Sequence, residues 1–304
     1  MNHCDILRLV GVALWLAFPV LADAAPLRHC GQPAQPSVAQ KDKLLRFAAV
    51  VKDTLESSGQ RLALVSRSGL DLSRFSVRYS HAGFSIKSGL DTPWAVRQLY
   101  YACDEERSRL YDQGMSGFVL GTDEPTIGYL SVVFLPLDAA AAIERAALDK
   151  QQVLKLLSAD YSANAYPFSL RYQNCNQWVV ELLAVALSGT NHHDGPNPRL
   201  EAQRWLQDQS YVPSVFALGS APLMWLAGWT PWLHNDDHPS AELEQLRYLV
   251  SMPASIEKFI RQQLPSATRI ELCHTDSHIV LHRGWDAVAD GCVAAAGDKV
   301  IALD

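Results

Sequence analysis

The sequence predicts an α+β fold, in which an antiparallel sheet packs on a helix that begins at a cysteine. The first reason is a hairpin-like pair of strands at residues 75–86 and 94–101, separated by a turn around Ser88-Gly89-Leu90-Asp91. The second is an amphipathic helix over residues 175–187. The third is composition, because 48% hydrophobic and 19% charged residues are typical of a globular chain.

The first half of the chain combines one helix with short strands. Apolar residues at helical spacing predict a helix over residues 42–58 that ends near Gly59. Residues 75–86 alternate between apolar and polar types, which places Tyr79 and His81 on one face of a strand. The expected strands are residues 61–66, 75–86, 94–101 and 128–135, with a last short strand at 279–281.

The second half is mainly helical, with helices expected at residues 137–158, 175–187, 200–209 and 241–264, the last broken around Pro253. The helix at 175–187 has an apolar face and should end at Gly189. Residues 212–233 are rich in tryptophan and interrupted by proline and glycine, so they cannot span a bilayer. They predict either a loop packed in the core or an apolar rim through which Trp225 and Trp229 contact acyl chains or a membrane surface.

The N-terminus predicts export. Residues 6–21 are largely apolar and are followed by Ala22-Asp23-Ala24, a small-x-small cleavage pattern, so residues 1–24 read as a signal peptide. An uncleaved anchor helix is the alternative. Residues 25–304 then form a single domain with helical and C-terminal extensions, in the periplasm or outside the cell.

Several classes of function are disfavoured by the composition. A formal net charge of −6 without a basic stripe argues against nucleic-acid binding. Histidines and aspartates cluster near residues 192–194, 234–238 and 274–282, but none of these runs has a known ligand spacing, so no metal is expected. No phosphate-binding glycine loop or dinucleotide fingerprint is present, and no cofactor is expected.

Cys175 is the strongest candidate for chemistry, because it lies at the predicted start of a helix. Unpaired backbone N–H groups and the helix dipole at that position favour the thiolate, which is the nucleophilic form, so we expect a lowered thiol pKa. His81, on a predicted strand, is the candidate base. We expect the two side chains to lie within about 8 Å of each other, close to contact range.

A histidine base needs a third group that fixes its tautomer. Gln98 on the neighbouring predicted strand is the favoured partner, since its amide can bond a ring nitrogen. Arg97 and Asp91 are weaker alternatives: a cation disfavours imidazolium, and Asp91 falls in the turn. A purely structural histidine is the competing interpretation of His81.

The cysteines are interpreted through the oxidising compartment. The expected pairs are Cys30–Cys103 and Cys273–Cys292, although four cysteines allow three pairings. This assignment leaves Cys175 free, as a nucleophile requires. The alternative is that all of them are reduced and buried.

Three motifs resemble a known group of proteins: Tyr79-Ser80-His81-Ala82-Gly83-Phe84, Tyr172-Gln173-Asn174-Cys175-Asn176-Gln177-Trp178 and Asp236-Asp237-His238-Pro239. The order of histidine on a strand, polar residue on the next strand and cysteine at a helix start is similar to the circularly permuted papain-like group. That group includes NlpC-type peptidases and amidases and lecithin:retinol acyltransferase-like proteins. The chain resembles more closely a bacterial family of exported proteins with no assigned function, over most of residues 40–260.

This resemblance implies a permuted papain-like fold in which Cys175 is the nucleophile, His81 the base and Gln98 the third residue. It favours an exported cysteine hydrolase or acyltransferase acting on an amide or ester bond of a cell-wall peptide or a lipid. Gln173 or Tyr172 is the expected second oxyanion donor, and Asp237 or His238 is expected to line the cleft. The rival interpretations are a binding module that keeps the fold without turnover and an envelope assembly factor that uses the tryptophan-rich surface.

Overall fold

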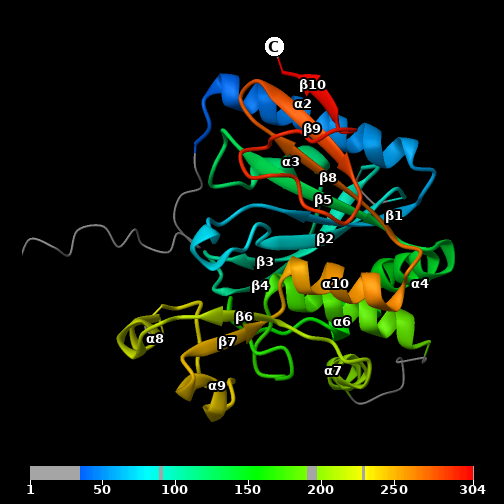
Figure 1. Ribbon diagram of the computed structural model, residues 1–304. Coiled ribbons are helices and arrows are strands. Elements are labelled where there is room, and N and C mark those ends of the chain that lie inside the picture. The colour runs from blue at the N-terminus through cyan, green and yellow to red at the C-terminus, as the bar shows by residue number, and fades with distance from the viewer. Residues whose placement is uncertain (1–34, 89–91, 190–196, 228–229, 304) are drawn as a thin grey trace, which may run out of the picture. The chain divides into compact units, whose positions relative to one another are not determined.

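Eight strands pair side by side into one antiparallel sheet in the computed structural model, which describes residues 35–88, 92–189, 197–227 and 230–303 (Figure 1). Their order is β10-β9-β8-β5-β1-β2-β3-β4. Their bounds are β1 Leu62–Arg67, β2 His81–Ile86, β3 Ala95–Ala102, β4 Arg107–Gln113, β5 Gly128–Phe134, β8 Thr268–His274, β9 His278–Arg283 and β10 Lys299–Ala302. The predicted α+β class with an antiparallel sheet is therefore confirmed.

Helices cover both faces of this sheet (Figure 1). On one face, α2 (Val38–Ser57) and α3 (Met115–Leu120) pack on the side chains of Ala63 and Val65. On the other face, Leu62 and Leu64 contribute to a core that includes helices α4 (Leu137–Leu148), α6 (Cys175–Ser188), α7 (Pro198–Asp208) and α10 (Pro253–Gln263). Successive side chains of a strand point to opposite faces. Every residue of β1 is buried because both faces are covered.

A smaller lobe lies beside the sheet at its β2–β4 side (Figure 1). It contains the two-stranded sheet of β6 (Ser214–Ala217) and β7 (Arg247–Val250), with the short helices α8 (Ala221–Ala227) and α9 (Ser240–Glu244). Its own small core includes Met224, Tyr248 and Val250. Trp225, by contrast, is 61% exposed.

Several elements differ from the sequence-based prediction. The strand predicted over 75–86 begins only at His81, because residues 73–75 form a 3₁₀ turn that ends at Ser76 in a left-handed conformation (φ 57°). The helix predicted over 137–158 stops at Asp149, whose carboxylate accepts from the backbone of a new helix, α5 (Lys150–Lys155).

The largest error falls on the segment predicted as a broken helix over 241–264. The structure has α9, then strand β7, then α10. In β7 Tyr248 and Val250 are buried, whereas Arg247 and Leu249 are half-buried. This is strand alternation rather than helical periodicity. The strands β4, β6, β8 and β10 and the short helix α3 were also missed.

Two cysteine predictions are tested by the structure. Cys273 and Cys292 form a disulfide, which confirms the predicted pair. Cys103 is disulfide-bonded, and its predicted partner Cys30 lies outside the described residues. Cys175 is a free cysteine, as predicted.

Two further predictions concern the N-terminal segment and the tryptophan-rich stretch. The predicted signal peptide (residues 1–24) and Trp229 both lie outside the described residues. The described residues belong to one compact unit that begins at Pro33. None of its helices is long and apolar enough to cross a membrane.

Candidate active site

The start of α6 is attached directly to the start of β2. Asn174 caps the helix by accepting from Gln177 N (2.7 Å), which makes Cys175 the first helical residue. The next side chain, Asn176, accepts from Ala82 N (3.0 Å) and donates to the backbone oxygen of Ser80 (3.1 Å). Asn176 therefore binds the two residues that flank His81 and holds the cysteine end of the helix against the histidine end of the strand.

His81 has the amide partner that the sequence predicted. Its Nε2 lies 2.5 Å from Gln98 Oε1 on β3. The Gln98 amide is itself oriented, because its Nε2 donates to Gln113 Oε1 on β4 (2.7 Å). A carbonyl oxygen only accepts, so His81 Nε2 carries the proton and Nδ1 is the basic nitrogen.

The His81 ring faces the α3 side of the sheet. Its centroid lies 5.4 Å from that of Tyr100 and 6.0 Å from that of Phe118. Cys175 instead belongs to the core on the α6 side. The two groups share one end of the sheet, and their predicted approach to within about 8 Å remains a prediction.

Two further side chains act on the thiol, and a third connects them. Arg67, at the end of β1 and directly paired with His81 in the sheet, stabilises negative charge on Cys175. The Tyr161 hydroxyl hydrogen-bonds the sulfur. Tyr100 hydrogen-bonds the Arg67 guanidinium and interacts with Tyr161, so it links the groups on the two faces of the sheet.

The expected lowering of the Cys175 pKa is wrong. Burial raises the pKa of this thiol to about 12, although the N–H groups of Asn176 and Cys175, the Arg67 guanidinium and the Tyr161 hydroxyl all act to lower it. Cys175 is only 9% exposed, so water is largely excluded from it, and the thiolate loses more hydration than these donors replace. Burial also raises the pKa of Tyr161, so its hydroxyl stays a donor at neutral pH.

Glu181 holds the framework behind the site. This carboxylate is completely buried. It accepts hydrogen bonds from Gln173 (2.6 Å), Gln177 (3.1 Å), Arg199 (2.9 Å) and Gln203 (2.7 Å). Because Arg199 also donates to the backbone oxygens of Leu170 and Tyr172 (2.9 Å each), one carboxylate joins α6, α7 and the segment that leads into α6.

The side chains of Gln173 and Tyr172, the predicted oxyanion donors, are both engaged in other contacts. Gln173 Nε2 donates to Glu181 and to the backbone oxygen of Leu156 (2.9 Å). Tyr172 stacks on His234, with ring centroids 4.3 Å apart, and its hydroxyl lies 3.4 Å from Asp236 Oδ2.

Asp237 and His238 bond the backbone of a neighbouring loop. Asp237 Oδ2 accepts from Tyr166 N (2.8 Å), and His238 Nε2 bonds the backbone oxygen of Asn164 (2.7 Å). Burial raises the pKa of Asp237 and lowers that of His238. The pair thus stabilises the loop that follows Tyr161, and its predicted place in the cleft stays a prediction.

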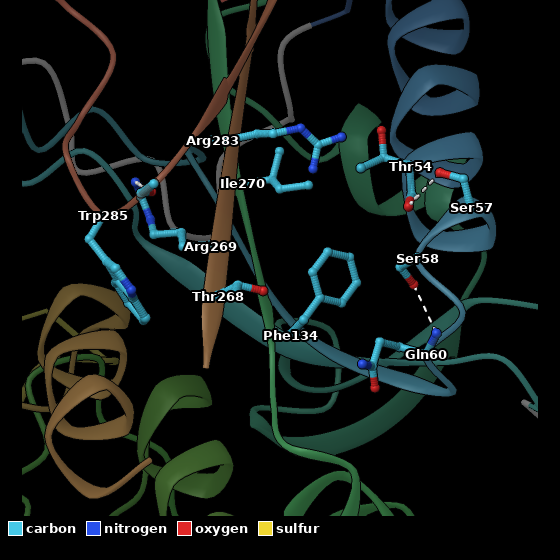
Figure 2. A pocket seen from close by; sticks show the side chains of 11 residues that line it. Thr54, Ser57, Ser58, Gln60, Phe134, Thr268, Arg269, Ile270, Arg283 and Trp285 are labelled. Carbon is cyan, nitrogen blue, oxygen red and sulfur yellow. Dashed lines mark hydrogen bonds between the residues drawn. The ribbon is translucent and has the colours of Figure 1, made fainter. Parts of the chain in front are cut away.

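A hollow in the described surface lies at the opposite end of β1 from Arg67 (Figure 2). Its volume is about 480 Å³, and it lies beside Gln60, Thr268 and Phe134, the last of which pairs with Ala63 near the start of β1. Figure 2 shows the Arg283 side chain beside Thr54 of α2. No cysteine, histidine or carboxylate lines this hollow, so no general base faces its serine and threonine hydroxyls.

The described ranges also contain no group of three or more His, Cys, Asp or Glu residues that is arranged to hold a metal ion. The reactive groups described at this end of the sheet are the Cys175 thiol, the His81 imidazole and the Gln98 amide. Sequence reasoning missed Arg67, Tyr100, Tyr161 and Asn176. Only Asn176 carried a signal, because it follows the cysteine within the motif.

A family model described as "Uncharacterized protein conserved in bacteria (DUF2145)" matches residues 54–260. The matched range contains Arg67, His81, Gln98, Tyr161 and Cys175. No curated protein and no solved structure shows a significant match to the chain.

The raised pKa of Cys175 predicts the pH dependence of its alkylation. A thiol whose pKa is raised holds less thiolate at neutral pH, so iodoacetamide should react with the folded protein more slowly than with the urea-unfolded protein at about pH 8. The rate in the folded protein should still be rising at about pH 10. Intact-protein mass spectrometry without reductant follows the reaction, and a plateau with a midpoint at or below about 8.5 would contradict the prediction.

Removing the Glu181 carboxylate should destabilise the protein strongly. Glu181→Ala leaves the Arg199 guanidinium buried without its anion, and losses of about 3–5 kcal/mol are typical of such changes. Urea unfolding followed by circular dichroism measures the effect. Glu244→Ala, at an exposed carboxylate on α9, is the matched control and should leave the midpoint unchanged. A loss for Glu181→Ala below about 1 kcal/mol would show that the network is dispensable.

Proposed function

The chain belongs to the DUF2145 family of bacterial proteins, and we propose that it is an exported cysteine hydrolase or acyltransferase that acts on an amide or ester bond. The observation that carries the proposal is the 2.5 Å contact between His81 Nε2 and Gln98 Oε1 at the end of the sheet where α6 begins with a free cysteine. This contact leaves His81 Nδ1 as a proton acceptor, which a buried neutral thiol requires.

In the proposed reaction, His81 Nδ1 takes the proton of the Cys175 thiol as the sulfur attacks the carbonyl carbon of the substrate. The carbonyl electron pair moves to oxygen, and a tetrahedral intermediate forms. The intermediate collapses when the bond to the leaving amine or alcohol breaks, and this group takes the proton from His81. Water then attacks the thioester in a hydrolase, whereas a second amine or alcohol attacks in an acyltransferase.

The charge on the intermediate needs donors close to the sulfur. The backbone N–H groups of Cys175 and Asn176 point towards the sulfur and are the proposed donors in this chain. The Tyr161 hydroxyl is a third donor at the same place. These groups replace Gln173 and Tyr172, whose side chains bond other parts of the fold.

The fold supports the proposal through the order of its parts. A histidine on β2, an amide on the adjacent β3 and a cysteine at the start of α6 follow the order of the permuted papain-like group. The disulfide between Cys273 and Cys292 is compatible with an oxidising compartment and thus with export. The proposed substrates are cell-wall peptides or lipid acyl groups.

One observation favours a second candidate, a binding module that keeps the fold without turnover. Burial raises the pKa of Cys175 to about 12, and a thiol that stays protonated can also be an inert core residue. Acylation of the protein distinguishes the two, since only a working His81 base makes the neutral thiol reactive towards an ester.

Incubation with a p-nitrophenyl acyl ester should form a thioester on Cys175 that peptide mass spectrometry locates. His81→Ala should slow acylation about 10²–10⁴-fold, the usual contribution of a general base, and Gln98→Ala should slow it less. His282→Ala is the matched control. This histidine lies on the far strand β9, where its ring bonds Asp298 (2.7 Å). Acylation of His81→Ala at the wild-type rate would refute the base, and no acylation of the wild type would favour the binding module.

We also propose that the lobe containing α8 contacts acyl chains or a membrane surface through Trp225. The side chain is 61% exposed, and Leu223 (39%) and Val215 (55%) are exposed in the same lobe. Tryptophan side chains on a surface commonly bind apolar partners or the membrane interface.

Replacing this tryptophan tests the membrane contact. Trp225→Ser should keep the unfolding midpoint but bind less to phosphatidylcholine vesicles, which are preferred because a chain of net charge −6 is repelled by anionic lipids. Flotation of vesicles measures the binding. Val293→Ser, at another exposed apolar side chain (59%), is the control and should change neither quantity. A large drop in stability would show instead that Trp225 is part of the core.

A further inference from the structure

We infer that Arg67 is the charged group that stabilises negative charge on the Cys175 sulfur and on the intermediate formed from it. The reaction itself rests on the proposed function, whereas the effect of Arg67 on the sulfur does not. Arg67 acts through Cys175, so it is a positioning residue rather than a catalytic one.

The sheet and α6 bring Arg67 to the thiol. Arg67 is the last residue of β1 and is the direct cross-strand partner of His81 in β2. The Asn176 side chain bonds Ser80 and Ala82 on either side of His81, and Asn176 follows Cys175 in the chain. The start of α6 is thus attached on both sides of the strand residue that pairs with Arg67, and the positive charge of Arg67 favours the thiolate form of Cys175.

Arg67 is buried without an ion pair among the described residues, which is unusual for an arginine. Only 5% of it is exposed. Its Nη1 donates to the backbone oxygens of Ser68 (3.2 Å) and Gly121, and its guanidinium lies 5.2 Å from the Phe118 ring centroid. These partners are neutral, and Nε has no hydrogen-bond partner. The positive charge is therefore held in place but not cancelled.

Two glycines keep space for this guanidinium. A Cβ atom at Gly69 would lie 2.6 Å from Arg67 Nη1, and one at Gly121 would lie 2.6 Å from Nη2. Neither glycine has the left-handed backbone that would by itself require glycine. Glycine at these two positions therefore leaves room for the Arg67 guanidinium, and the backbone conformation does not require it.

The other titratable groups at the site do not replace this charge. Tyr161 faces the sulfur, Tyr100 hydrogen-bonds Arg67, and His81 lies on the neighbouring strand. Among the described residues, Asp123 is the carboxylate that acts on Arg67, and its influence is weaker than those of Tyr100 and Cys175. A buried cation with no close anion stabilises whatever negative charge forms next to it, and at this site that charge is on the sulfur.

The test measures the alkylation of Cys175 by iodoacetamide from about pH 6 to pH 10.5, where the rate follows the thiolate fraction. Arg67→Gln should lower the rate at each pH about tenfold or more, equivalent to a thiol pKa at least one unit higher. Arg67→Lys keeps the charge and should retain the rate within about threefold. An Arg67→Gln protein with wild-type circular dichroism and a wild-type rate would overturn the inference.

Gly121→Ala gives a second test that does not remove the charge, in case Arg67→Gln fails to fold. The added methyl group displaces the guanidinium, so the alkylation rate should fall. Gly114→Ala, at the other end of α3, is the matched control, because the added Cβ meets only Thr92 at 3.6 Å. An unchanged rate in Gly121→Ala would count against Arg67.

The outcome is separate from that of the hydrolase proposal. If Arg67→Gln slows alkylation but no ester acylates the wild type, the role of Arg67 stands and the enzymatic function falls. If acylation depends on His81 while Arg67→Gln alkylates normally, the enzyme stands and the role of Arg67 falls.

Discussion

The buried carboxylate of Glu181 is the interaction on which the arrangement of the site depends. It is completely shielded from water and is compensated by Arg199 and by three glutamine side chains from α6, α7 and the preceding segment. Arg199 extends the network to backbone oxygens of that segment, which leads from Tyr161 to Cys175. A buried charge is tolerated only with such complete hydrogen bonding, so the network determines where the segment must lie.

A second constraint acts at the thiol itself. The backbone N–H groups at the start of α6, the Arg67 guanidinium and the Tyr161 hydroxyl all stabilise the thiolate. Burial outweighs them and raises the pKa of Cys175 to about 12. In the proposed reaction, these donors therefore act on charge that forms only when a substrate arrives. Donors held in a dry site stabilise a transition state more than they stabilise the resting enzyme. Arg67, buried and without an ion pair among the described residues, fits this organisation.

The sheet places the two halves of the site on opposite faces at one end. His81, Gln98 and Tyr100 belong to the side that α3 covers, whereas Cys175 and Tyr161 belong to the core on the α6 side. Tyr100 connects the two groups through Arg67 and Tyr161. The hollow at the other end of β1 contributes none of these groups.

Local patterns in the sequence were sufficient for the α+β class, the position of α6, the pairing of His81 with Gln98 and the disulfide between Cys273 and Cys292. Helical spacing, strand alternation and short cysteine separation are properties of nearby residues, and such properties can be read along the chain. Edge strands such as β4 and β10 were missed because they bury too little apolar surface to alternate clearly. The roles of Arg67, Tyr161 and Glu181, and the raised pKa of Cys175, were decided only by the tertiary structure. Each of them depends on which distant residues exclude water from a side chain, and desolvation has no signature in the order of residues along the chain.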